Sequence, residues 1–254
     1  MRCPRAIQPA IPVNVTCSGD DSARGAFLGA EAGGLGHGTP RGTLEGSLSG
    51  RSVGLQTVRM SDLKEPKSAL RHYLQSNRDA LLWKLDGLSE RDLRMPRTPT
   101  GTNLIGIVKH MANVEIGYFG DTFGREWPTP KDRILEEELE ADPQADWYAT
   151  EGETCDGIID LYRRVWSFAD ATIEELPLDA LGRVPWWREE SNPVTLARIM
   201  VHVIVDLARH VGHADILREG IDGVAGLRAD VSNLPEQQDW AAYLAKLTSL
   251  AERF

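Results

Sequence analysis

Apolar residues recur with the period of an α-helix in five stretches of the chain, all after residue 60. We predict helices over residues 66–85, 103–119, 154–176, 193–219 and 236–253, the fourth of them stopped by Gly220. A short capped turn is expected at 89–92, and a polar region at 120–149 whose acidic run, Glu136 to Glu138, is a solvated face. No stretch alternates apolar and polar residues as a half-buried strand does. The pattern therefore predicts an all-α helical bundle with an extra C-terminal helix.

The first 59 residues show no such periodicity and are rich in glycine, as in the segment 33–38. A segment of this kind buries too little apolar surface to offset its ordering entropy, so we expect it to be disordered. Charged, helix-forming sequence begins abruptly at Met60. Two interpretations stay open: residues 1–59 are translated upstream sequence and Met60 is the natural start, or they are a genuine disordered tail. Either way, the predicted domain covers residues 60–254.

Composition narrows the class of partner. The net charge of −10 argues against nucleic acid and against anionic membranes, because both need a basic surface. No run approaches the roughly 20 apolar residues of a membrane span. Three scattered cysteines are too few for a disulfide framework, which fits a reducing cytoplasm. The remaining expectation is a cytoplasmic protein that acts on a small molecule.

The predicted helix 193–219 carries a polar stripe on an otherwise apolar surface. Each residue of an α-helix is turned by about 100° around the helix axis from the one before it. Measured from His202, the angle around this axis is about 20° for His213, about 40° for Asp206 and about 80° for His210. A helix that is apolar on most sides is buried, and burying Asp and His is costly unless they are paired or bind a metal. From spacing alone, both a metal site and a buried Asp–His ion pair remain open.

A metal site needs a third ligand, because Asp206 and His210, at i and i+4, supply only two. His110 is the natural choice, since it lies in the middle of the apolar helix predicted at 103–119. Two histidines and one carboxylate leave coordination positions open, which is typical of a reactive site and suits zinc, nickel and iron alike. His202, one turn before Asp206, is the alternative to it as the middle ligand.

The segments 103–112 (NLIGIVKHMA) and 208–219 (ARHVGHADILRE) resemble the DinB-like superfamily, and within it an actinobacterial branch. That superfamily includes mycothiol-dependent maleylpyruvate isomerase and bacillithiol transferases. The resemblance covers most of residues 60–254. It implies a four-helix bundle, commonly a homodimer, with one metal-binding histidine on the second helix and two ligands four residues apart on a later helix.

By this resemblance, the first ligand falls on His110, the middle one on Asp206 and the last on His210. The middle ligand is often histidine, and in the isomerase it is glutamate, so the shorter Asp206 is a departure that affects affinity. His202 and His213 are expected to support catalysis, or else to be packed histidines. Arg209 is expected to meet a carboxylate of a thiol or substrate, unless it is simply solvated.

The resemblance implies a thiol-dependent transferase or isomerase, in which a divalent metal, zinc first, activates a thiol such as mycothiol. Alternatives are a hydrolase that uses a metal-bound water, with His202 or His213 as base, and a non-catalytic, dimeric metal-binding bundle. Trp186 and Trp187 line a pocket mouth or plug the end of the bundle. Cys155 has no activating neighbour in the sequence and is expected to be a plain helix cysteine.

Overall fold

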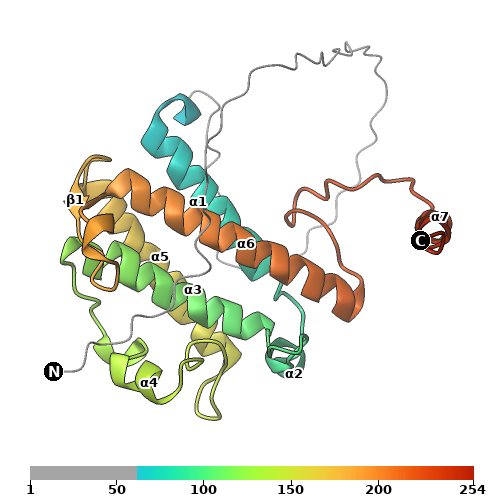
Figure 1. Ribbon diagram of the computed structural model, residues 1–254, viewed down its shortest axis with the longest axis horizontal. Helices are drawn as coiled ribbons and strands as arrows, with labels where there is room; N and C mark the ends of the chain where they lie inside the picture. Colours follow the sequence, from blue (N-terminus) through green and yellow to red (C-terminus); the bar gives the residue numbers. More distant parts are fainter. Residues whose placement is uncertain (1–61) are drawn as a thin grey trace, which may run out of the picture. The chain divides into compact units, whose positions relative to one another are not determined.

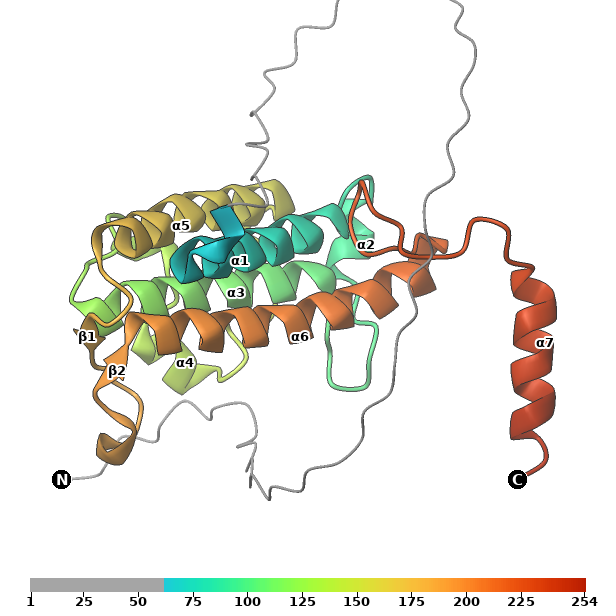
Figure 2. The ribbon, with the colours of Figure 1, turned by 90° about the horizontal axis from the view of Figure 1, so that it is seen from above.

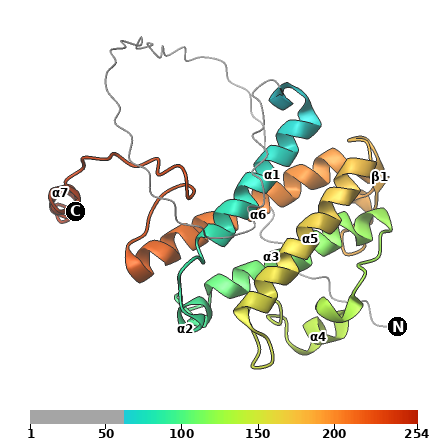
Figure 3. The same cartoon turned by 180° about the vertical axis from the view of Figure 1, so that it is seen from behind.

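The computed structural model describes residues 62–254, and nearly all of the regular secondary structure there is helical. Four long helices form a bundle: α1 (Pro66–Trp83), α3 (Leu104–Phe119), α5 (Cys155–Glu175) and α6 (Leu196–Asp222). Their axes run side by side (Figures 1 and 2). α3 packs against both α5 and α6, and α1 packs against α6; the view from behind shows α5 alongside α3 (Figure 3). The predicted all-α, DinB-like bundle is confirmed.

Short elements connect and flank the bundle. These are α2 (Glu90–Arg94), α4 (Glu136–Ala141) and α7 (Trp240–Ala251), the last being the extra C-terminal helix that the sequence predicted. The acidic run forms the first turn of α4, and all three of its glutamates are exposed as expected. Two strands, β1 (Leu181–Gly182) and β2 (Val194–Thr195), pair antiparallel just before α6. The sequence did not indicate them, because two residues are too few to show a period.

Capping residues set the ends of the site helices. Asn103 precedes α3, and its Oδ1 accepts a hydrogen bond from the Gly106 amide at 2.8 Å. Thr195 caps α6 in the same way. The predicted end of this helix at Gly220 is wrong. α6 continues to Asp222 and stops at Gly223, whose φ of +77° is the left-handed conformation that ends helices.

A buried charged cluster in the core ties three helices together. Glu115 of α3 is fully buried, and its carboxylate accepts hydrogen bonds from Arg78 of α1 at 2.5 Å and from the Tyr162 hydroxyl of α5 at 2.9 Å. Arg78, itself only 1% exposed, also pairs with Asp170 of α5 at 2.8 Å. Most of the core is apolar, with leucine, isoleucine and valine side chains from all four long helices.

The C-terminal helix α7 differs from the other helices, because every one of its side chains is exposed. These include Trp240, Tyr243 and Leu247, which lie on one face. Among residues 62–254, no helix is both long and apolar enough to cross a membrane. The predictions for residues 1–59, including a start at Met60, concern a segment outside the described residues, and the domain boundary stays a prediction.

Candidate metal centre

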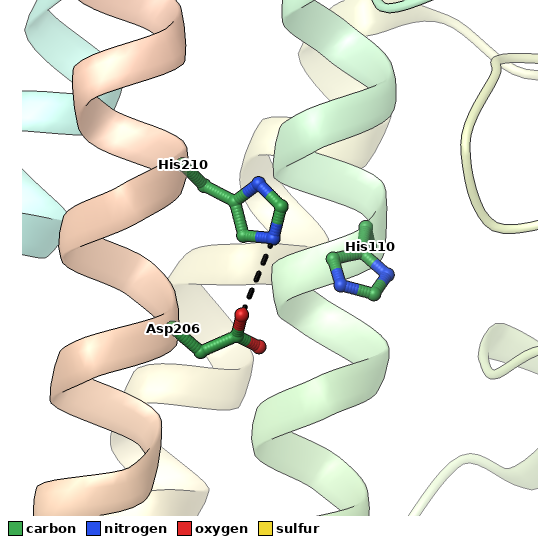
Figure 4. A group of neighbouring side chains, drawn as sticks. All are labelled: His110, Asp206 and His210. Atoms are coloured by element: carbon green, nitrogen blue, oxygen red, sulfur yellow. Dashed lines mark ion pairs between the residues drawn. The ribbon is translucent and has the colours of Figure 1, made fainter. Parts of the chain in front are cut away.

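Asp206 and His210 lie one turn apart on α6, with their side chains on the side that faces α3 (Figure 4). Nε2 of His210 is 3.4 Å from Oδ1 of Asp206, and the two side chains are 12% and 21% exposed. Burial by itself raises the pKa of Asp206, but the neighbouring histidines, His210 first, bring that pKa below its ordinary value. Asp206 is therefore ionised at neutral pH, as a metal ligand must be.

His110 reaches the same place from α3. Its ring lies edge-on to the ring of His210, with 5.1 Å between the ring centroids. The His110 side chain is 17% exposed, and its Nδ1 is 2.7 Å from Oδ2 of Asp146, which leaves Nε2 as the ring nitrogen free to bind another group. Two long helices thus bring together the three residues that the sequence analysis selected.

The donor set of this group fits a divalent transition metal. One ligand atom from each of His110, Asp206 and His210 lies within 4.8 Å of the others. The 3.4 Å between Asp206 and His210 equals the edge of a tetrahedron whose corners lie about 2.1 Å from a central zinc ion. His110, whose ligand atom lies within 4.8 Å of the other two, needs to approach by at most about 1.4 Å to complete such a geometry. Nδ1 of His210 is buried and has no hydrogen-bond partner among the described residues. Buried polar atoms are normally paired, so this ring has a nitrogen that the described residues leave unsatisfied.

His202 lies one turn before Asp206 but is not part of the group within 4.8 Å. Its Nε2 is 3.0 Å from the hydroxyl of Tyr118, and its ring packs edge-on against Tyr118 and Trp187. Burial lowers the pKa of His202 and outweighs the opposing effect of the Asp206 carboxylate, so the imidazole is neutral at pH 7. Of the two alternatives for the middle ligand, it is Asp206 that lies in the group with His110 and His210.

Trp186 and Trp187 both pack edge-on against Tyr118, which lies at the C-terminal end of α3. Trp186 also fills the space beside Gly117, where an added Cβ would lie 2.8 Å from the indole ring. Both indoles are half-buried. The two tryptophans form an aromatic wall next to His202.

His213 and Arg209 lie on the solvent side of the centre. The His213 ring is 5.5 Å from that of His210, and the pKa of His213 is lowered, first by partial burial and then by electrostatic repulsion from His210 and Arg209. Both side chains are exposed.

Cys155 is at the first position of α5, away from the centre. It is buried, and burial, helped by Glu90, raises the pKa of its thiol to about 11. The thiol is therefore protonated at neutral pH, in agreement with the expectation that it is not a nucleophile.

Sequence reasoning missed Asp146 and Trp147, which contact His110 from the segment between α4 and α5. Trp147 stacks on the imidazole with 3.9 Å between ring centroids. Both residues lie in the polar region 120–149, where no periodicity indicates which side chains turn inward. The sequence signal was limited to an acid–aromatic pair in an otherwise polar stretch.

Comparison with known families places this centre in context. A search of curated proteins finds no match to the chain. The family model described as mycothiol S-transferase matches residues 69–223, which include most of α1, all of α2 to α6 and all three residues of the centre. This family is part of the DinB-like superfamily that the sequence resembled. The match covers more than half of the chain, and the chain belongs to the mycothiol S-transferase family.

Proposed function

We propose that the chain is a metal-dependent thiol S-transferase, in which His110, Asp206 and His210 hold a divalent ion. Zinc is the first choice, with nickel or iron as alternatives for this donor set. The observation that carries the proposal is the group of two imidazoles and one carboxylate in a chain of the mycothiol S-transferase family. When bound, such an ion lowers the pKa of a thiol that coordinates it and so makes a thiolate available at neutral pH.

The chain's own residues handle the proton and orient the substrates. His213 and His202 have lowered pKa values, so each is a neutral base at pH 7. His213 is exposed and can pass a proton on to solvent, whereas His202 is bonded to Tyr118. Arg209 is the nearby exposed cation and would bind a carboxylate or another acceptor group of the substrates.

The proposed reaction is a nucleophilic substitution at a carbon atom of the second substrate. The S–H bond of mycothiol or a related thiol breaks, and its proton passes to His213 or His202. The sulfur forms a bond to an electrophilic carbon, and the leaving group departs with the bonding electron pair. The aromatic wall of Trp186 and Trp187 lies beside His202 and would exclude water from this side of the centre.

The first test is the metal content of the full-length protein. We expect about one divalent ion per chain, and its loss in His110→Ala, Asp206→Ala and His210→Ala. His72→Ala is the matched control, because His72 lies on α1 and its ring contacts only that of Tyr73 among the described aromatic side chains. Equal metal content in all four variants and the parent would overturn the proposed centre.

The second test is the conjugation of mycothiol to monobromobimane. We expect turnover that requires both protein and metal, that falls in the three ligand variants and that survives in His72→Ala. A protein that binds metal but shows no thiol-dependent turnover would overturn the transferase proposal. Metal-dependent ester hydrolysis by the same preparation would instead indicate a hydrolase, and inactivity in both assays would indicate a non-catalytic metal-binding bundle.

The expected homodimer and the cytoplasmic location stay predictions. Light scattering coupled to size exclusion of the full-length chain measures the first, and fractionation of the producing cells measures the second. A monomer at micromolar concentration would contradict the dimer.

A further inference from the structure

His110 has a carboxylate behind it, on the side of the ring opposite to the nitrogen that is free to bind a metal. Nδ1 of His110 is 2.7 Å from Oδ2 of Asp146, and the two side chains are only 17% and 14% exposed. A carboxylate accepts hydrogen bonds, so this contact places the imidazole proton on Nδ1. The lone pair of a neutral ring then lies on Nε2, the atom that a metal needs.

Trp147 holds the plane of the same imidazole. Its indole stacks on His110 with 3.9 Å between centroids and 17° between planes, and it also packs against the edge of His210 at 5.3 Å. Rotation of the His110 ring about its Cβ–Cγ bond would break both the stacking on Trp147 and the hydrogen bond to Asp146. Two consecutive residues therefore fix two properties of one imidazole, its tautomer and its orientation.

The segment that carries Asp146 and Trp147 is held by one face of α3. Nδ2 of Asn103 donates to the Trp147 carbonyl at 3.0 Å, and Nζ of Lys109 donates to the Tyr148 carbonyl at 3.0 Å. Between them lies Gly106, where an added Cβ would be only 1.9 Å from the Trp147 carbonyl oxygen. The N-cap Asn103, Gly106 and Lys109 are three residues apart, and His110 follows Gly106 by four, so these residues lie on the same side of the helix.

We propose that Asp146 is a positioning residue of the metal centre, and that the strip formed by Asn103, Gly106 and Lys109 sets its position. α3 and its N-cap thus supply both the ligand His110 and, through Asn103, Gly106 and Lys109, the contacts that orient this ligand. The inference rests on the proposed function, since it assigns Asp146 a role toward a metal ligand. It adds residues outside the three ligands to those that determine metal affinity.

The test is the zinc affinity of the full-length protein, measured by competition with a chromophoric chelator. We expect Asp146→Ala to weaken binding about 10- to 100-fold, the usual effect of losing the partner of a ligating histidine. Asp146→Asn should recover most of this loss, because its amide oxygen still accepts the Nδ1 proton. Glu151→Gln is the matched control, an exposed acid of the same connection with no side-chain hydrogen bond among those described, and should bind as the parent does.

A second readout does not depend on bound metal. In the metal-free protein, nitrogen NMR shifts of the His110 ring should report a proton on Nδ1 in the parent and a mixture of tautomers in Asp146→Ala. A purely structural role of Asp146 would change stability without changing this ratio. Zinc affinity of Asp146→Ala within twofold of the parent, or an unchanged tautomer ratio, would overturn the inference.

The failures of the two proposals are distinguishable. If the parent binds zinc and His110→Ala does not, but Asp146→Ala does so normally, only the inference fails. If the parent does not bind zinc, or binds it as His110→Ala does, the proposed function fails and the inference with it.

Gly106→Ala tests the role of the strip without touching a ligand or Asp146. The new methyl group would overlap the Trp147 carbonyl, so the segment must move away from α3, and zinc affinity should fall at least about 10-fold, as for a lost partner of the ligand. Gly220→Ala is the matched control, a glycine of α6 with nothing within 4 Å of an added Cβ. Circular dichroism of both variants verifies folding, and a folded Gly106→Ala with parental affinity would contradict the role of the strip.

Discussion

Replacing Glu115 by glutamine should be among the most destabilising conservative changes in this domain. Glu115 is fully buried and accepts hydrogen bonds from Arg78 and from the Tyr162 hydroxyl. Burial alone would lower the pKa of Arg78, but its carboxylate neighbours, Glu115 first, raise it above the ordinary value, so the guanidinium keeps its charge. Glutamine retains an oxygen for Tyr162 but turns an amide group, which also donates, toward the guanidinium.

The magnitude follows from what the variant leaves unpaired. Removing one partner of a buried ion pair costs about 3–5 kcal/mol, because the other charge stays buried. Arg78 keeps its contact with Asp170, a partly exposed residue, so we expect the lower end, about 3 kcal/mol. Glu115→Ala also strands the Tyr162 hydroxyl and should cost at least about 1 kcal/mol more. Since a domain is stable by only about 5–15 kcal/mol, either loss is easily measured.

The assay is urea unfolding followed by far-ultraviolet circular dichroism. The matched control is Glu174→Gln, whose partner Arg71 and own side chain are 43% and 67% exposed. An exposed pair contributes about 0–1 kcal/mol, so the control should unfold almost as the parent does. If Glu115→Gln loses no more free energy of unfolding than Glu174→Gln, the reasoning from burial is refuted.

Three further predictions use other parts of the molecule. Cys155 should resist iodoacetamide at pH 8 in the native state and react in urea, as measured by mass spectrometry of the peptide that contains it. Its pKa in the folded protein, about 11, exceeds the value of 9.0 for a free thiol, so the thiol of the unfolded chain loses its proton first. The free energy of unfolding should therefore fall as pH rises above 9.0. Labelling of the native thiol at the unfolded rate would contradict this. A chain ending at Asn233 lacks only exposed side chains of the described structure and should keep its free energy of unfolding within about 0.5 kcal/mol; a larger loss would indicate that the apolar face of α7 is covered. Chelation of metal should lower the urea midpoint of the parent but not of Asp206→Ala, since only a bound ligand stabilises by mass action.

Periodicity was sufficient to predict the fold. α1, α5 and α6 each bury one apolar face and α3 buries most of its surface, so apolar residues recur along the sequence at helical spacing. The ends of helices were less certain, as α6 illustrates. Gly220 has an ordinary helical conformation, and it is Gly223 that takes the left-handed one. A glycine permits the end of a helix without requiring it.

The centre was predictable in part, for geometric reasons. The angular positions at about 100° per residue placed Asp206 and His210 on one face, because both belong to the same helix. It did not determine their partner across the bundle, which depends on how α3 packs against α6; the resemblance supplied His110. Asp146 was out of reach, since the path of a loop has no period. Glu115 was a missed signal, because a lone acid in the apolar run 111–119 has to find a buried partner.

The polar residues of α3 have a consequence for the sliding of helices. His110 and Glu115 are five residues apart, so they point in directions about 140° from one another. Leucine and isoleucine interdigitate almost as well after a helix slides by one turn, but such a slide would carry His110 about 5.4 Å along α6 and take Glu115 away from Arg78 at the same time. The buried ion pair of Glu115 and Arg78 therefore fixes the axial position of α3 in the bundle. It keeps His110, on the opposite side of this helix, at the same height as Asp206 and His210.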